Sequence, residues 1–270
     1  IVNPFYSETS KIIEETLRKL GYSLIICNTN NQSDLQNKYM DILLQRQVDG
    51  IIFGSVKTND KNIKKFVEQG FPFITYHRHL TNKNSNFVIS DDIEGIKIAV
   101  KHLVDLGHKD IAYISGPTSF STGFNRLKGF IESRNSFKIN NDGSFIQDGG
   151  FSEKKSWLAT KKLLNSTNPP TAIIAANDLM AISALDCILQ HGFSVPKDIS
   201  LIGYDNINLA SHARIQLTTI SIAKKKMANL AAELLVKKIM GKKEESKKIQ
   251  IKLTPKLILR KTTDKVNRIK

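Results

Sequence analysis

The hydrophobic positions of this chain follow a regular alternation: a short apolar run, a turn, an amphipathic stretch with helical spacing, and another apolar run. The stretch 8–20 carries Ile12, Ile13, Leu17 and Leu20 at helical spacing and ends at Gly21, so a helix is predicted there. Repeated alternation of this kind is typical of α/β folds with parallel sheets and helices on both faces.

The alternation forms two series. The first series predicts helices at 8–20, 34–45 and 60–68, and strands at 22–28, 50–55, 71–76 and 87–91. The second predicts helices at 93–106, 121–133, 152–164 and 178–190, and strands at 111–115, 172–177 and 199–205. Two series of βα units predict two lobes, each with its own doubly wound parallel sheet.

Both ends of the pattern are irregular. The chain opens at IVNPFYSE with no strand before the first helix, so we expect the first strand of the sheet to be missing from this sequence. A late helix at 225–240 has no strand series of its own, and it could return to the first lobe. That return would make the connection between the lobes multi-stranded.

Composition narrows the class of protein. No apolar run approaches the roughly 20 residues that span a bilayer, and the first residues do not have the order of a secretory signal. The two cysteines, Cys27 and Cys187, lie in apolar surroundings and are more consistent with free thiols than with a disulfide or a metal site. We therefore predict a cytoplasmic protein that does not associate with membranes.

The net charge of +15 is concentrated near the end of the chain. The cations of segment 237–270 alternate with apolar residues, as in KKIQIKLTPKLILRK, which indicates strands with one solvated face. Contact with an acidic partner is the alternative interpretation of this charge.

The usual catalytic signatures are missing, and no cofactor is expected: the sequence has no phosphate-binding glycine loop, H-E-x-x-H, C-x-x-C or G-x-S-x-G. His77 and His79 would share a face on an extended segment, but no third metal ligand is evident. An enzyme such as a sugar hydrolase would need a paired acid and base, and Asp205 has no convincing carboxylate partner.

Ligands of doubly wound sheets bind beyond the carboxyl ends of the strands, so the polar residues at those positions are the candidates for binding. They are His77, Arg78, Asn177, Asp178, Asp205 and Asn206, together with the 3–6 entry and Arg126 on the helix after strand 111–115. The aromatic residues that could add flat apolar walls are Phe5, Phe120, Phe151 and Trp157. Such a set suits a sugar, through paired hydrogen bonds to hydroxyls and stacking on the ring.

Helix capping is the competing interpretation of these polar residues. We expect capping for Asp178, Asp91 and Asn206. For Arg126 and Asp205 we expect a ligand role, because a charged group at a strand end beside an interlobe cleft needs a partner.

Several long motifs resemble the lactose-repressor (LacI-type) transcription regulators and the related periplasmic sugar-binding proteins. The resemblance covers essentially the whole chain, and its motifs are NPFYSE, VDGIIF, HLVDLGHKDIAYISGP, RLKGF, PPTAIIAANDLMAISAL, VPKDISLIGYDNI, QLTTI and LILRKTT. The segments LGHKDIAYISGP and PKLILRKTT look like the regulators rather than the transport branch.

The resemblance implies the effector-binding core of a dimeric repressor of carbohydrate metabolism that reads operator DNA through an N-terminal helix-turn-helix domain absent from this sequence. It implies a small sugar or sugar phosphate bound between the lobes; a solute-binding protein for transport is the alternative. Three crossovers would divide the chain into residues 1–91 with 222–252, and 92–221 with 253–270. The implied effector contacts, with His77 added from the strand ends, are Phe5, His77, Arg78, Arg126, Phe151, Asn177 and Asp205.

Two positions depart from the family pattern. His77 stands where many members have an acidic residue, and Ile222 stands where many have glutamine in TTI-x-Gln. Because both lost groups commonly contact the effector, the sugar could be held differently here or be replaced by another ligand. A histidine near the ligand could also make binding depend on pH.

Overall fold

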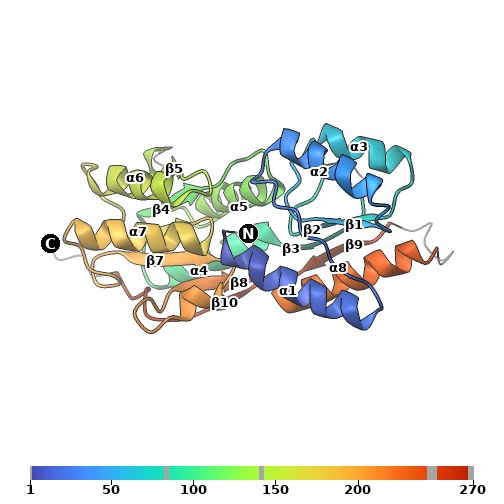
Figure 1. Ribbon diagram of the computed structural model, residues 1–270. Coiled ribbons are helices and arrows are strands. Elements are labelled where there is room, and N and C mark those ends of the chain that lie inside the picture. The colour runs from blue at the N-terminus through green and yellow to red at the C-terminus, as the bar shows by residue number, and fades with distance from the viewer. Residues whose placement is uncertain (1, 82–84, 140–142, 242–247, 267–270) are drawn as a thin grey trace. The chain divides into compact units, whose positions relative to one another are not determined.

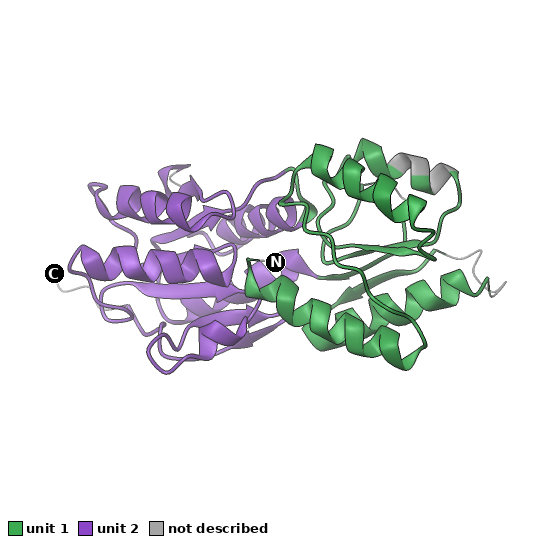
Figure 2. Ribbon diagram, in the orientation of Figure 1, with its two compact units in different colours: residues 1–90, 119–121, 223–253 green, residues 91–118, 122–222, 254–270 purple. Residues whose placement is uncertain are grey.

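The computed structural model describes residues 2–81, 85–139, 143–241 and 248–266, which fall into two compact units. Unit 1 spans residues 1–90, 119–121 and 223–253, and unit 2 spans residues 91–118, 122–222 and 254–270 (Figure 2). Among the described residues, no helix is long and apolar enough to cross a membrane.

Unit 1 is built on a parallel sheet with the strand order β1-β2-β3-β9. The strands are β1 (Ile51–Phe53), β2 (Phe73–Tyr76), β3 (Phe87–Ser90) and β9 (Gln250–Leu253). Helix α8 (Lys224–Ile239), the late helix of the sequence, packs on this sheet and against α1 (Pro4–Lys19). Helices α2 (Ser33–Gln45) and α3 (Lys61–Glu68) cover the opposite face, where they share a core with β1 and β2 (Figure 1).

Helix α1 begins four residues before its predicted start. Asn3 caps it by accepting a hydrogen bond from the Phe5 backbone N–H at 2.9 Å, and Pro4 takes the first helical position, where a missing N–H costs nothing. The capping places Phe5 in the first turn of the helix.

One predicted strand is wrong. Segment 22–28 has the composition of a strand but forms no sheet pairing, and β1 pairs with β2 alone among the described residues. A strand is defined by a hydrogen-bonded neighbour, and an apolar pattern does not supply one. Without such a neighbour, Ile25 and Ile26 remain 55% and 53% exposed.

Unit 2 contains a six-stranded sheet in the order β10-β8-β7-β6-β4-β5, parallel except for β10. The strands are β4 (Ile111–Ser115), β5 (Ile146–Asp148), β6 (Ala172–Ala175), β7 (Ser200–Tyr204), β8 (Thr218–Ser221) and β10 (Lys256–Ile258). Strands β4, β6 and β7 are buried along their whole length, as continuous apolar runs predict. The short β5 was not predicted, because its sequence IQD has no strand pattern.

Four long helices complete unit 2. They are α4 (Asp92–Asp105), α5 (Ser121–Ser136), α6 (Glu153–Leu164) and α7 (Asp178–Gln190). Helices α6 and α7 pack against each other and on strands β4 to β7, whereas α4 contacts β6, β8 and β10. The α/β fold with two parallel-sheet units, predicted from the alternation of apolar and amphipathic segments, is confirmed.

Candidate functional site

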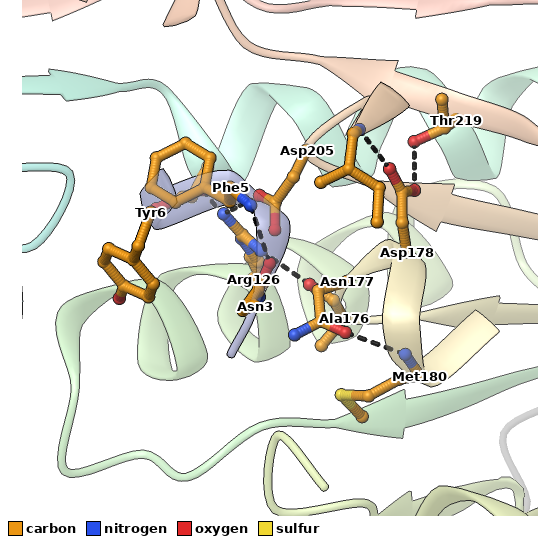
Figure 3. A network of polar contacts seen from close by, with 12 residues as sticks. Asn3, Phe5, Tyr6, Arg126, Ala176, Asn177, Asp178, Met180, Asp205 and Thr219 are labelled. Carbon is orange, nitrogen blue, oxygen red and sulfur yellow. Dashed lines mark hydrogen bonds and ion pairs between the residues drawn. The ribbon is translucent and has the colours of Figure 1, made fainter. Parts of the chain in front are cut away.

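A buried ionic cluster in unit 2 centres on Arg126, which lies in the second turn of α5 (Figure 3). Its Nε donates to Asp92 Oδ1 at 2.8 Å, and its Nη2 donates to Asp205 Oδ1 at 3.1 Å. Its Nη1 donates to the carbonyl oxygen of Ala176 at 2.6 Å, and its guanidinium carbon lies 3.7 Å from the centre of the Tyr204 ring. Four residues, from α4 and from the ends of β6 and β7, thus converge on one arginine.

The sequence places these partners at the same edge of the unit 2 sheet. Ala176 follows β6 and Asp205 follows β7, so both lie at the carboxyl ends of parallel strands. Asp92 is the first residue of α4, whose N-cap is Asp91. The edge at which a doubly wound sheet binds ligands is therefore the edge that holds the cluster.

The cluster is almost completely removed from solvent, since Arg126 is 1% exposed and both carboxylates are buried. Burial by itself lowers the pKa of the Arg126 guanidinium, but the attraction of Asp92 and then Asp205 outweighs burial and raises that pKa above its ordinary value. Burial, followed by the charge of Asp92, raises the pKa of Tyr204. The cluster is thus a fixed cation with two carboxylates and a neutral phenol.

The two carboxylates and the guanidinium place hydrogen-bond acceptors and donors side by side. A ligand that carries hydroxyl groups can interact with both kinds of group, because each hydroxyl can donate to a carboxylate and accept from an N–H group. The chemistry of the cluster therefore suits a polyhydroxylated small molecule.

The backbone at Asp205 is strained. Its φ is +100°, in a region that residues with a side chain rarely occupy, and Asn206 follows at φ +51°. Strain of this kind costs about 1–3 kcal/mol per residue and persists only where the surroundings impose it. The carboxylate orientation at Asp205 is thus one that the fold maintains at a cost.

Of the two polar residues at the start of α7, Asn177 and not Asp178 caps the helix. Asn177 is the N-cap of α7, and its Oδ1 accepts from the Met180 N–H at 2.9 Å. The expected capping by Asp178 is wrong: its carboxylate accepts from Thr219 Oγ1 at 2.5 Å and from the Ile207 N–H at 2.8 Å (Figure 3). Asp178 ties β8 to the turn after β7.

Of the other two residues expected to cap a helix, one does and one does not. Asp91 caps α4 as expected, accepting from the Glu94 N–H at 3.2 Å. Asn206 does not cap a helix: its Oδ1 accepts from Arg260 Nη2 at 2.8 Å, and its Nδ2 donates to Ser221 Oγ at 3.3 Å.

The predicted site residues of unit 1 form an aromatic group. The rings of Phe5 and His77 are 4.2 Å apart, and Phe5 stacks on Tyr76 with centroids 6.2 Å apart. His77 is buried and has φ +65°, directly after β2. Arg78 Nη1 donates to Asn31 Oδ1 at 2.7 Å, and its guanidinium carbon lies 3.8 Å from the centre of the Phe120 ring.

Phe151 belongs to unit 2 and has φ +52°. Its ring packs on the backbone at Gly116, where an added Cβ would lie 2.3 Å from Phe151 Cε1. The ring therefore lies against the glycine that follows β4, and only glycine fits there. The roles of all seven residues in binding a ligand remain predictions.

Two members of the Arg126 cluster escaped prediction from the sequence. Asp92 is the neighbour of Asp91, whose capping role was predicted, but the sequence did not indicate that Asp92 turns inward. Tyr204 is the last residue of β7 and has the pattern of a core residue. Pairing of Asp92 with Arg126 depends on α4 lying beside α5, which no local pattern specifies.

Comparisons with known proteins cover nearly the whole chain. A family model described as a periplasmic binding protein-like domain matches residues 100–263. The HTH-type transcriptional regulator DegA of Bacillus subtilis is 34% identical over 270 residues, covering 99% of this chain and 79% of that protein. The HTH-type transcriptional repressor PurR of Mannheimia succiniciproducens is 30% identical over 265 residues, covering 97% and 78%.

A solved structure agrees with these relatives. The LacI family transcriptional regulator from Enterococcus faecium, with bound ribose, has a TM-score of 0.87 and 28% identity, covering 99% of this chain and 97% of that one.

The two parallel-sheet units and the buried Arg126 cluster define a periplasmic-binding-protein-like sensor of small molecules. The chain belongs to the LacI family of transcription regulators, of which it is the effector-binding core. Its relatives are regulators, which supports a regulatory core over a transport protein.

Proposed function

We propose that this core binds a sugar or sugar phosphate at the Arg126 cluster and that binding changes the affinity of the regulator for operator DNA. The observation that carries the proposal is the buried guanidinium shared by Asp92 and Asp205, which offers paired donors and acceptors to hydroxyl groups. The bound ribose of the Enterococcus faecium relative supports a sugar as the ligand class.

The other predicted residues are proposed as further ligand contacts within their own units. In unit 2, Phe151 offers a flat apolar face for a sugar ring and Asn177 a hydrogen-bonding group. In unit 1, Phe5 offers such a face, and His77 and Arg78 offer hydrogen-bonding groups. We expect no catalysis, because Asp92 and Asp205 both accept hydrogen bonds from Arg126 and neither is placed as a general acid.

As a regulator, the protein would act in the cytoplasm, where its DNA target lies, and would read the operator through a helix-turn-helix domain. The HTH-type names of DegA and PurR support this partner. Effector and operator then change each other's affinity by the same factor, because linkage is reciprocal.

A ligand screen tests the proposed site. We expect D-ribose or another sugar or sugar phosphate from a panel of sugars, sugar phosphates, nucleobases and amino acids to raise the melting temperature, by mass action on the folded state. Asp205→Asn keeps the shape of the side chain but removes its charge, so the affinity for that sugar should fall at least about tenfold, or 1.4 kcal/mol. Isothermal titration calorimetry measures both affinities.

The matched control is Asp186→Asn, on the exposed face of α7, which should leave the affinity unchanged. A sugar that binds Asp205→Asn as tightly as the parent chain would contradict the cluster as the site. A nucleobase or amino acid as the only hit would contradict the ligand class.

We further propose that the regulator is a homodimer that uses the exposed face of α6 and α7. In unit 2, Glu153, Lys154, Trp157, Leu158 and Ser183 line an open surface cavity of about 430 Å³. Leu158 is 51% exposed beside the half-buried Trp157, and exposed apolar surface of this kind is typical of an interaction site.

Light scattering after size exclusion tests the dimer. The parent chain should elute with twice the monomer mass, and Leu158→Lys should shift it toward monomer, because a buried charge opposes association. Phe124→Lys is the matched control: Phe124 is 50% exposed on α5 and should leave the mass unchanged. Equal masses for Leu158→Lys and the parent chain would rule out this face.

A further inference from the structure

We propose that Arg260 is a positioning residue for the ligand site: it holds Asn206, and through Asn206 it fixes the strained turn that aims the Asp205 carboxylate at Arg126. The inference rests on the proposed ligand site, since Asp205 belongs to that site. Arg260 itself lies two residues beyond the end of β10.

The turn after β7 needs such a support. Asp205 and Asn206 are consecutive residues with positive φ, +100° and +51°. An aspartate that relaxed to its usual backbone conformation would carry its carboxylate away from the guanidinium. The strained conformation is held only if contacts on both sides of Asp205 fix it.

The side before Asp205 is fixed by the sheet. The Asp205 N–H donates to the Ile220 carbonyl at 2.9 Å, which continues the pairing of β7 with β8. Tyr204, the preceding residue, is fully buried beneath Arg126. These contacts position the backbone on the N-terminal side of Asp205.

The side after Asp205 is fixed at two successive residues. At Asn206, Oδ1 accepts from Arg260 Nη2 at 2.8 Å and Nδ2 donates to Ser221 Oγ at the longer distance of 3.3 Å. At Ile207, the backbone N–H donates to Asp178 at 2.8 Å. Asp178 is itself held by Thr219 Oγ1 at 2.5 Å. The two supports act on successive residues of the turn.

Arg260 is well anchored for this role. Its Nη1 donates to the Leu217 carbonyl at 2.6 Å, and its backbone N–H donates to Thr218 Oγ1 at 3.0 Å. A planar guanidinium can donate to Leu217 and Asn206 at once, in fixed directions. A lysine would supply the charge without that two-pronged geometry.

The test measures hydrogen exchange at Arg126 and not ligand affinity, so it remains valid if no sugar binds. Hydrogen exchange of the Arg126 Nε–H group is measured by NMR in the full 270-residue chain, with Arg126→Lys used to assign the signal. In Arg260→Gln we expect exchange about tenfold faster, which corresponds to about 1.4 kcal/mol less opening free energy. Arg260→Lys should fall between Arg260→Gln and the parent chain.

A double-mutant cycle separates positioning from simple stabilisation of the C-terminal segment. Glycine accepts φ +51° without strain, so Asn206→Gly allows the same backbone conformation and removes the side chain that contacts Arg260 and, at 3.3 Å, Ser221. If Arg260 acts through Asn206, Arg260→Gln should change Arg126 exchange little further in the Asn206→Gly background. Lys261→Gln, on the exposed neighbour of Arg260, should leave exchange at the parental rate.

The proposal is overturned if Arg260→Gln folds and Arg126 exchange stays at the parental rate, or if the two substitutions speed exchange additively. Should Arg260→Gln fail to fold, Arg260→Lys and Asn206→Gly decide together: unchanged exchange in either variant overturns the proposal, and faster exchange in both supports it. Loss of sugar affinity in Asp205→Asn without an effect of Arg260→Gln would leave the site in place and remove only this inference.

Discussion

Replacing Arg126 by methionine should lower the free energy of unfolding of unit 2 by about 3–5 kcal/mol, because two buried carboxylates would then face each other without a counter-charge. Arg126 is 1% exposed and binds both Asp92 and Asp205. Methionine fills a similar volume, so the expected loss comes from charge rather than from a cavity. Trp157 is the only tryptophan and lies in unit 2, so its fluorescence in a urea titration reports this loss.

Two further variants serve as controls for Arg126→Met. A triple variant, Arg126→Met with Asp92→Asn and Asp205→Asn, removes the unpaired charges and should recover a large part of the lost stability. Arg18→Met breaks an exposed ion pair with Glu14 on α1 and should change stability by less than about 1 kcal/mol. A loss below about 1 kcal/mol in Arg126→Met would show that the carboxylates do not depend on Arg126.

The fold was predictable from sequence wherever a βα unit carries its own signals. Helices α2, α3, α6 and α7 begin and end within one residue of the predicted positions, because their apolar spacing is regular. The errors occur where structure depends on a distant partner. Segment 22–28 has strand composition without a paired neighbour, and β5 has a neighbour in β4 without strand composition.

The sequence likewise identified part of the candidate site. The strand-end pattern identified Asp205, the helix after strand 111–115 added Arg126, and the structure brings the two within hydrogen-bonding distance. Capping by Asp91 was predicted correctly. The inward role of Asp92 and the division of roles between Asn177 and Asp178 were not, because one residue of each pair caps a helix and the other turns toward a partner far along the chain. Which residue turns inward depends on helix packing, and packing is a tertiary property.

Packing also makes a single glycine of α4 important for the cluster. Gly95 lies against the Tyr204 ring, and a Cβ added at Gly95 would lie 2.3 Å from Tyr204 Oη and 2.9 Å from Cζ. The ring cannot retreat freely, because it is fully buried and the Arg126 guanidinium lies 3.7 Å from its centre. The close packing of α4 against the Tyr204 ring therefore requires glycine at position 95.

Gly95→Ala should consequently destabilise unit 2 by about 1–3 kcal/mol in the urea titration, even though alanine favours a helix by up to about 1 kcal/mol over glycine. The displaced ring would also disturb Arg126, so sugar affinity should fall together with stability. Gly95→Ala with Tyr204→Phe removes the atom in closest contact and should recover part of the stability, whereas Gly143→Ala, where nothing lies within 4 Å of the added Cβ, should be neutral. A neutral Gly95→Ala would mean that α4 can move away from β7, and the cluster would then be less rigid than its contacts indicate.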